Sequence, residues 1–410
     1  MKKANVFVAL VIVSTIATAS EAPSERSVAD VLPPDLVKGS LHTVIDPVTS
    51  DGYLDSYQIE SQFGSAVVIG RAQLRAHIIE IAALNELDEI SKTKVFVDAA
   101  AAAGINTVKS ITRVFTEPKE TFKGLPKGVG RLFSKTKTTV QRGFRKAGEI
   151  VKGESPTDAA AMVVRNSQIS RAERSWAKKL GVDPYSTNLV LRDAIGSVAL
   201  VDSAASFTVG LAIPGVNIGI SVLGELADEV WSMAPSELEA KNRERFGKAG
   251  FSDSNVDAII DNIWYTPTWQ TVLASSAATL EGVENIATIA TSIMSVGSYD
   301  EARFVMQITA MLAWYHAVET PLESIIDDPQ LPHAIDMAGR HVALFPIDHL
   351  FATEQTTEVA DRLRSAVPSQ VHRLWITGTT SAQAATTLQR SGWMVEENTM
   401  SDLVDRLELR

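Results

Sequence analysis

The pattern of apolar and polar residues divides the chain into a long helical region flanked by two regions of β-strand character. Between residues 41 and 70, β-prone runs alternate with the turn signals Asp46-Pro47 and Asp51-Gly52, which predicts a small antiparallel meander. From Ala72 the apolar residues recur at every third and fourth position, as on one face of a helix, until about Ala103. We therefore expect residues 71–118 to be mainly helical.

Residues 154–330 predict a helical domain, because helical periods follow one another between breaks rich in proline and glycine. Thr157 to Leu180 forms one predicted helix that ends at Gly181. Ser236-x-x-Glu239 fits a capping box, and Ser252 precedes another apolar face. No repeat of 30–45 residues is present in this region.

The C-terminal residues 340–410 predict a compact α/β module. Its expected strands are 341–345, 373–377 and 394–397, and its expected helices are 353–367 and 381–390. This βαβαβ order is the signature of a small parallel sheet. The sequence as a whole thus predicts a mainly α, multi-helical protein with a small N-terminal β meander and a C-terminal α/β module.

Residues 1–19 carry the features of a cleavable signal peptide. Lys2 and Lys3 precede an uncharged apolar run, and Ala17-Thr18-Ala19 supplies the small residues that signal peptidase requires. The alternative is an uncleaved membrane anchor, but the apolar run is shorter than the roughly 20 residues of a membrane-spanning helix. We expect the mature chain to start at Ser20, followed by a polar linker over residues 20–40.

Composition narrows the compartment and the chemistry. The chain of 410 residues has no cysteine, which excludes thiol nucleophiles, disulfides and thiolate metal sites. Together with the signal peptide, this composition favours export to a bacterial periplasm or cell envelope. The 45% of hydrophobic residues is enough to build buried cores.

Charge is unevenly distributed along the chain. The formal net charge is −11, yet residues 119–151 hold nine Lys/Arg and two acids, a local net charge of +7. Such a reversal of sign points to a partner surface more strongly than the net charge does. We define residues 119–153 as the basic segment.

The basic segment contains an eleven-residue repeat. Phenylalanine recurs at 122, 133 and 144, and valine recurs at 129, 140 and 151. Eleven residues make three helical turns, so one apolar seam stays aligned between basic flanks. The spacing resembles the eleven-residue repeats of synucleins and apolipoproteins, which implies a way of lying on lipid and no kinship. Gly124, Pro126, Gly128 and Gly130 make the first repeat a poor helix.

This seam predicts association with an anionic lipid surface or envelope polyanion. The alternatives are a solvated basic helix packed on the acidic remainder of its own chain, and binding to a protein partner. Export and the acidic remainder argue against nucleic acid. The predicted contact residues are Phe122, Lys123, Lys127, Arg131, Phe133, Lys135, Lys137, Arg142, Phe144, Arg145 and Lys146.

Residues 203–223 are uncharged and long enough to span a bilayer. Pro214-Gly215 interrupts the segment at its middle, and Asn217 lies inside it. A buried helical hairpin and a membrane-inserted segment are therefore both compatible with this sequence.

Candidate metal-binding residues are most frequent between residues 316 and 349, which are rich in histidine, aspartate and glutamate. His316 and Glu319 are three residues apart on a predicted helix and could face one metal ion together with His333 and His341. No His-Glu-x-x-His or other established signature accompanies them, and no cofactor motif is present.

Three functional hypotheses follow. The first is an exported, non-enzymatic helical protein that associates with a membrane or envelope surface through the basic segment. The second is a metal-dependent hydrolase that uses the residues around His316. The third is a soluble periplasmic scaffold whose C-terminal module binds another protein.

Overall fold

The computed structural model describes residues 20–102, 128–134, 156–202, 222–367, 369 and 371–408. Three predicted features lie wholly or largely outside these residues: the signal peptide, most of the basic segment, and the apolar segment 203–223. Within the described ranges, none of the helices combines the length and the apolar character that a membrane crossing requires.

The predicted N-terminal meander is confirmed. Strands β1 (His42–Ser50), β2 (Asp55–Ser61) and β3 (Gly64–Ile69) form an antiparallel sheet in the order β1-β2-β3. Buried residues alternate along β2, as expected of a sheet with one covered face. The predicted linker instead contains two one-turn helices that pack on β1, α1 (Val28–Val31) and α2 (Pro34–Val37).

Two helices that were predicted as continuous are each divided by a local hydrogen bond. The first consists of α3 (Arg71–Lys92) and α4 (Lys94–Ala102). Between them Thr93 is extended, and its hydroxyl donates to the Ile90 carbonyl over 2.8 Å. A threonine side chain that bonds to the backbone can end a helix even where the apolar period continues.

The second division lies between α6 (Pro156–Ser167) and α7 (Arg171–Leu180). Ser170 begins α7 with a capping box, in which its hydroxyl accepts from the Glu173 amide over 3.1 Å. The Glu173 carboxylate accepts in return from the Ser170 amide over 2.7 Å. Gly181 ends α7 in a left-handed conformation, as predicted.

The remaining helical region is built around α14 (Tyr299–Val318). Its residues 304, 305 and 306 are all at most 1% exposed, so the middle of this helix has no solvent face. The other elements of this region are α8 (Leu189–Asp202), α9 (Val222–Ser232), α10 (Pro235–Lys248), α11 (Asp253–Ile260), α12 (Pro267–Thr279), η2 (Ile286–Thr288) and α13 (Ile289–Met294).

The C-terminal module contains the predicted βαβαβ unit. Its parallel strands are β6 (His341–Phe345), β8 (His372–Ile376) and β10 (Trp393–Glu396). They are connected by α15 (Glu354–Ser365) and α16 (Ala382–Arg390). The observed bounds lie within two residues of the predicted ones.

The sheet is larger than predicted, because an antiparallel hairpin extends it. Strands β4 (Leu322–Ile326) and β5 (His333–Asp336) join beside β6, giving the order β10-β8-β6-β5-β4. The module also contains two short strands that pair with each other, β7 (His349–Leu350) and β9 (Thr379–Thr380). It ends with the helix α17 (Ser401–Glu408). The protein is therefore mixed α/β and not all-α.

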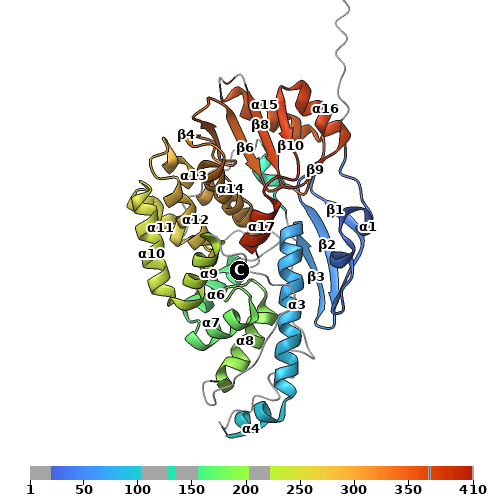
Figure 1. Cartoon of the computed structure of the whole chain (residues 1–410), viewed down its shortest axis with the longest axis vertical. Helices are drawn as coiled ribbons and strands as arrows, with labels where there is room; N and C mark the ends of the chain where they lie inside the picture. Colours follow the sequence, from blue (N-terminus) through green and yellow to red (C-terminus); the bar gives the residue numbers. More distant parts are fainter. Residues whose placement is uncertain are drawn as a thin grey trace, which may run out of the picture.

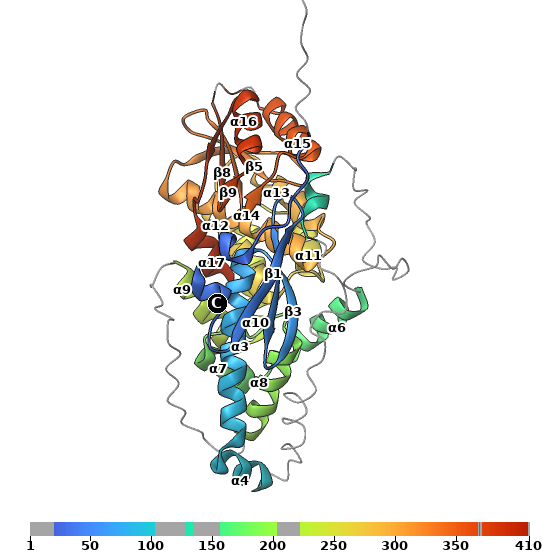
Figure 2. The same ribbon diagram turned by 90° about the vertical axis from the view of Figure 1, so that its right-hand side faces the viewer.

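Figures 1 and 2 show an elongated molecule with the C-terminal sheet at one end and α4 at the other. One hydrophobic cluster combines the C-terminal sheet with α10 to α14, Tyr53 and η1 (Gly130–Phe133). A second cluster combines the N-terminal sheet with α3, α7 and α8. Both cores therefore draw on segments that are distant in sequence.

The turn between β1 and β2, together with Asp55 at the start of β2, crosses from the N-terminal sheet to the C-terminal module. The Tyr53 carbonyl accepts from the Asp348 amide over 3.0 Å. The Asp348 carboxylate accepts in turn from the Asp55 amide and from the Arg71 amide at the start of α3, each over 3.1 Å. Asp348 thus links the end of β6, the N-terminal sheet and α3.

Beside Asp348 lies a pocket of about 440 Å³ that opens to solvent. It lies beyond the carboxyl ends of β6 and β8, the edge at which open α/β sheets usually bind ligands. Burial raises the pKa of Asp348 and of its neighbour Asp55. Because the protein's own amides already bind the Asp348 carboxylate, this pocket is primarily a structural junction.

Replacing Asp348 with Ala is expected to lower the free energy of unfolding by about 1–2 kcal/mol, because α3 loses its capping acceptor. Asp348→Asn should lose less, since its amide oxygen can still accept. Urea unfolding at pH 7.5 measures both. Asp361→Ala, at an exposed position of α15, should change stability by less than about 0.5 kcal/mol. An equally small effect for Asp348→Ala would contradict the junction role.

Candidate functional site

Residues 128–134, which we call the anchor, are the described part of the basic segment, and they are inserted into the protein core. Leu132 is fully buried and Phe133 is 3% exposed. Gly130–Phe133 forms the single 3-10 turn η1, and Ser134 after it is extended. The segment is therefore not a continuous amphipathic helix through this point.

The anchor begins at the β1–β2 turn. Asp51 accepts from the Leu54 amide within its own turn over 2.8 Å and from the Val129 amide over 2.7 Å. Gly128 has a φ of +63°, and a Cβ there would lie 2.3 Å from the Asp51 carboxylate. Glycine at 128 is consequently required both by the backbone and by the close approach of Asp51.

Arg131 holds the anchor to the start of α14. Its Nε donates to Glu301 over 2.6 Å, its guanidinium forms an ion pair with the same carboxylate, and Nη2 donates to the Ser295 carbonyl over 2.9 Å. Glu301 is only 3% exposed. For Arg131, the alternative that the basic segment packs on acidic residues of its own chain is therefore the correct one.

Phe133 lies among aromatic side chains from three parts of the chain. Its ring stacks on Tyr53 with 3.6 Å between centroids, and meets Phe304 and Phe345 edge-on at 5.7 and 6.0 Å. The same two stacked rings line an apolar cavity, about 340 Å³ including the part that opens to solvent, against α15, α16 and the sheet. Phe133 is a core residue, which corrects the prediction that it faces a lipid surface.

Two amide side chains add further contacts to the anchor. Gln355 of α15 donates to the Gly130 carbonyl over 2.8 Å, and Gln330 donates to the Arg131 carbonyl over 3.4 Å. Both donors belong to the C-terminal module, so the anchor joins this module to the β1–β2 turn. The other predicted contact residues of the basic segment lie outside the described residues: Phe122, Lys123, Lys127, Lys135, Lys137, Arg142, Phe144, Arg145 and Lys146.

The predicted metal site is not assembled. The His316 Nδ1 accepts from the Leu322 amide over 2.9 Å, while Glu319 is exposed at the end of α14. Burial lowers the pKa of His316. Of the four predicted ligands only His333 and His341 meet, and no group of three or more His, Asp or Glu among the described residues is arranged to hold a metal ion.

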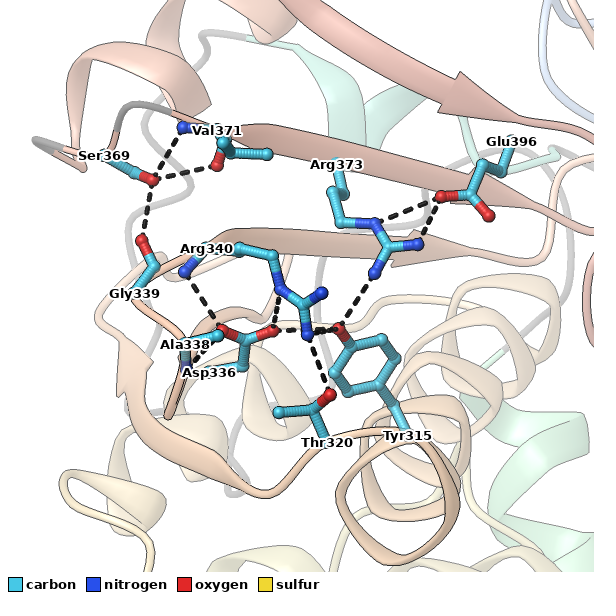
Figure 3. Close-up of polar contacts among 10 residues, drawn as sticks. All are labelled: Tyr315, Thr320, Asp336, Ala338, Gly339, Arg340, Ser369, Val371, Arg373 and Glu396. Atoms are coloured by element: carbon cyan, nitrogen blue, oxygen red, sulfur yellow. Dashed lines mark hydrogen bonds and ion pairs between the residues drawn. The ribbon is translucent and has the colours of Figure 1, made fainter.

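The buried carboxylate of β5, Asp336, is bound to other partners. Asp336 is buried and accepts from the Tyr315 hydroxyl over 2.9 Å and from the Arg340 Nε over 2.7 Å (Figure 3). It also accepts from the backbone amides of residues 338 and 340. Arg373 continues the network from Tyr315 to Glu396. These contacts stabilise the end of the C-terminal sheet at which the parallel strands β6 and β8 begin.

A histidine absent from the sequence prediction joins the two that do meet. His333 Nδ1 lies 2.7 Å from His341 Nε2, and His341 Nδ1 lies 2.9 Å from His372 Nδ1. The last pair follows from strand register, because His341 of β6 is opposite His372 of β8. These rings are hydrogen-bonding partners and not metal ligands, since the central ring uses both of its nitrogens.

Phe133→Ala is expected to lower the free energy of unfolding by about 3–5 kcal/mol, because it removes a buried aromatic ring. Phe133→Leu should cost less, since it keeps much of the volume. Urea unfolding is the measurement. Met337→Ala, at a residue that is 67% exposed, is the control and should stay within about 0.5 kcal/mol of the wild type. Phe133→Ala with wild-type stability would show that the anchor is not part of the core.

Arg131→Gln is expected to cost about 3 kcal/mol, because it leaves the buried Glu301 carboxylate without its cation. Glu301→Gln in the same chain should recover part of that loss, since the uncompensated charge is removed. A double-mutant cycle on unfolding free energies measures the coupling. Strict additivity of the two substitutions would rule out the ion pair as a link in the anchor.

Comparison with known proteins adds no relative to this description. No family model, curated protein or solved structure matches the chain.

Proposed function

We propose that the protein is an exported, non-enzymatic protein that attaches to anionic lipid or polyanion at the bacterial envelope through its basic segment. The observation that carries the proposal is the anchor. A stretch of net charge +7 in an otherwise acidic chain is fixed to the core at its middle by Arg131 and Phe133. The two flanks of the stretch therefore start from one defined point on the body.

The anchor changes which charges serve attachment. Arg131 is neutralised by Glu301, so the flanks carry the remaining charge. Residues 119–127 hold three lysines and one acid, and residues 135–151 hold five basic residues and one acid. The second flank thus supplies most of the attraction to an anionic surface.

The anchor also changes the apolar part of the proposal. With Phe133 in the core, Phe122 and Phe144 are the two aromatic residues of the seam left to enter a lipid boundary. One lies in each flank. Attachment by two linked flanks is tighter than attachment by either alone, because binding of the first makes the second intramolecular.

The test is co-sedimentation with vesicles of phosphatidylglycerol and phosphatidylcholine, using the chain from Ser20 so that residues 1–19 cannot bind lipid themselves. The wild type should sediment with these vesicles and not with phosphatidylcholine alone. At about 1 kcal/mol for each basic residue, removing five charges of the second flank should abolish sedimentation. That variant changes Lys135, Lys137, Arg142, Arg145 and Lys146 to Gln.

A control variant of equal net charge removes five exposed lysines elsewhere and should sediment like the wild type. Its substitutions, all to Gln, are at Lys38, Lys92, Lys94, Lys178 and Lys248. Phe122→Ser with Phe144→Ser should weaken binding without disturbing the anchor. An equal loss of sedimentation in the flank and control variants would show that net charge alone causes binding, and it would contradict the proposal.

A further inference from the structure

Three histidines form a continuous chain across β5, β6 and β8, which we call the imidazole chain. His333 and His341 are fully buried and His372 is 6% exposed. The ring of Trp393 lies over two of them, 5.0 Å from His341 and 5.5 Å from His372. The Trp393 Nε1 donates to the Ala360 carbonyl of α15 over 3.1 Å, so Trp393 connects the imidazole chain to this helix.

The geometry fixes how many protons the imidazole chain can hold. Three neutral rings carry three N–H groups, of which two make the hydrogen bonds and one remains at an end of the chain. The end at His333 Nε2 is buried and has no hydrogen-bond partner among the described residues. A fourth proton therefore either creates a buried, unsatisfied charge there or enters through His372, the more exposed end.

The cations that face the chain belong to α15. Burial is the main cause that lowers the pKa of both end rings. At His372 the next cause is Arg364, which lowers the pKa further, while at His333 Asp328 raises it by more than Arg362 lowers it. Among the described residues, Asp328 is the carboxylate that faces His333, and it is already bound by Arg362. A positive charge at the His372 end of the chain would therefore repel Arg364 of α15.

The same helix holds the anchor. Gln355, at the start of α15, donates to the Gly130 carbonyl. Further along, Val359, Ala360 and Leu363 line the apolar cavity that Phe133 and Tyr53 also line. Displacement of α15 would remove both a hydrogen bond and one wall of the site that holds Phe133.

We propose that the imidazole chain is a proton-operated latch, which keeps α15 closed over the anchor while neutral and releases the anchor on protonation. The idea that this latch regulates attachment to the envelope rests on the proposed function. The conformational change itself concerns only the described contacts between α15 and residues 128–134. Mild acid would thus free Phe133 from the core.

The sign follows from linkage. Burial lowers the pKa of all three rings in the closed state, so an open state with ordinary values near 6.5 binds more protons. Opening is favoured as the pH falls below about 6.5, by about tenfold per pH unit for each proton taken up. Elsewhere burial raises the pKa of Asp55, Asp348 and Asp183. Those carboxylates favour the folded state in acid, so a local measurement is needed.

The experiment uses the absence of cysteine. Leu132→Cys places one thiol in the anchor, and Leu191→Cys places one at an equally buried position of α8. Labelling with 4,4′-dithiodipyridine is followed from pH 7.5 to pH 5, without lipid, and each rate is divided by that of the same variant unfolded in urea. The normalised rate at residue 132 should rise at least tenfold, and that at residue 191 should not.

His341→Gln in the Leu132→Cys chain should make the rise smaller, because one of the three rings that take up protons is removed. Should that variant not fold, Arg364→Gln at an exposed position serves instead. It should make the rise smaller, since the closed state then tolerates the proton better. A flat profile at residue 132, or an unchanged rise in His341→Gln or in Arg364→Gln, overturns the latch. The labelling experiment contains no lipid, so its result does not depend on whether the protein binds vesicles. Likewise, a negative labelling result would not affect the co-sedimentation test.

Discussion

The turn between β1 and β2, together with Asp55 at the start of β2, is the constraint on which the rest of the structure depends. Its backbone receives hydrogen bonds from the end of β6, its aspartates bind the anchor and the N-terminal sheet, and Tyr53 stacks on Phe133. A β-turn normally lies at the surface. Here it is buried because the C-terminal module supplies the partners that its backbone would otherwise find in water.

Much of the C-terminal module could be predicted, because apolar strands alternating with capped helices leave few other arrangements. The hairpin β4–β5 could not, since its strands are short and lie in a stretch rich in acids, which suggests a loop. Its pairing depends on tertiary contacts such as the one between Tyr315 and the buried Asp336. The module therefore begins near residue 322 and not at 340. A fragment 340–410 would lack two strands of its own sheet.

The site was predicted less well, for two physical reasons. The repeat at residues 122, 133 and 144 is an apolar seam whether lipid or protein covers it, so periodicity alone could not assign Phe133 to the core. The histidines named as metal ligands were selected by residue type and spacing. Only the register that pairs His341 with His372 reveals a hydrogen-bonded chain, and register between distant strands is not encoded in local sequence.

Charge is placed in the core in two opposite ways. Carboxylates such as Asp348 are buried beside backbone amides and arginines, and burial favours their protonated form. His333 and His372 are buried beside arginines of α15, and burial favours the neutral form of all three histidines. A fall in pH therefore stabilises the folded state through the buried carboxylates and destabilises it through the buried histidines. The overall stability of the protein can stay nearly constant over a pH range in which the balance between its parts changes. Such compensation lets one helix respond to protons while the core that carries it remains folded.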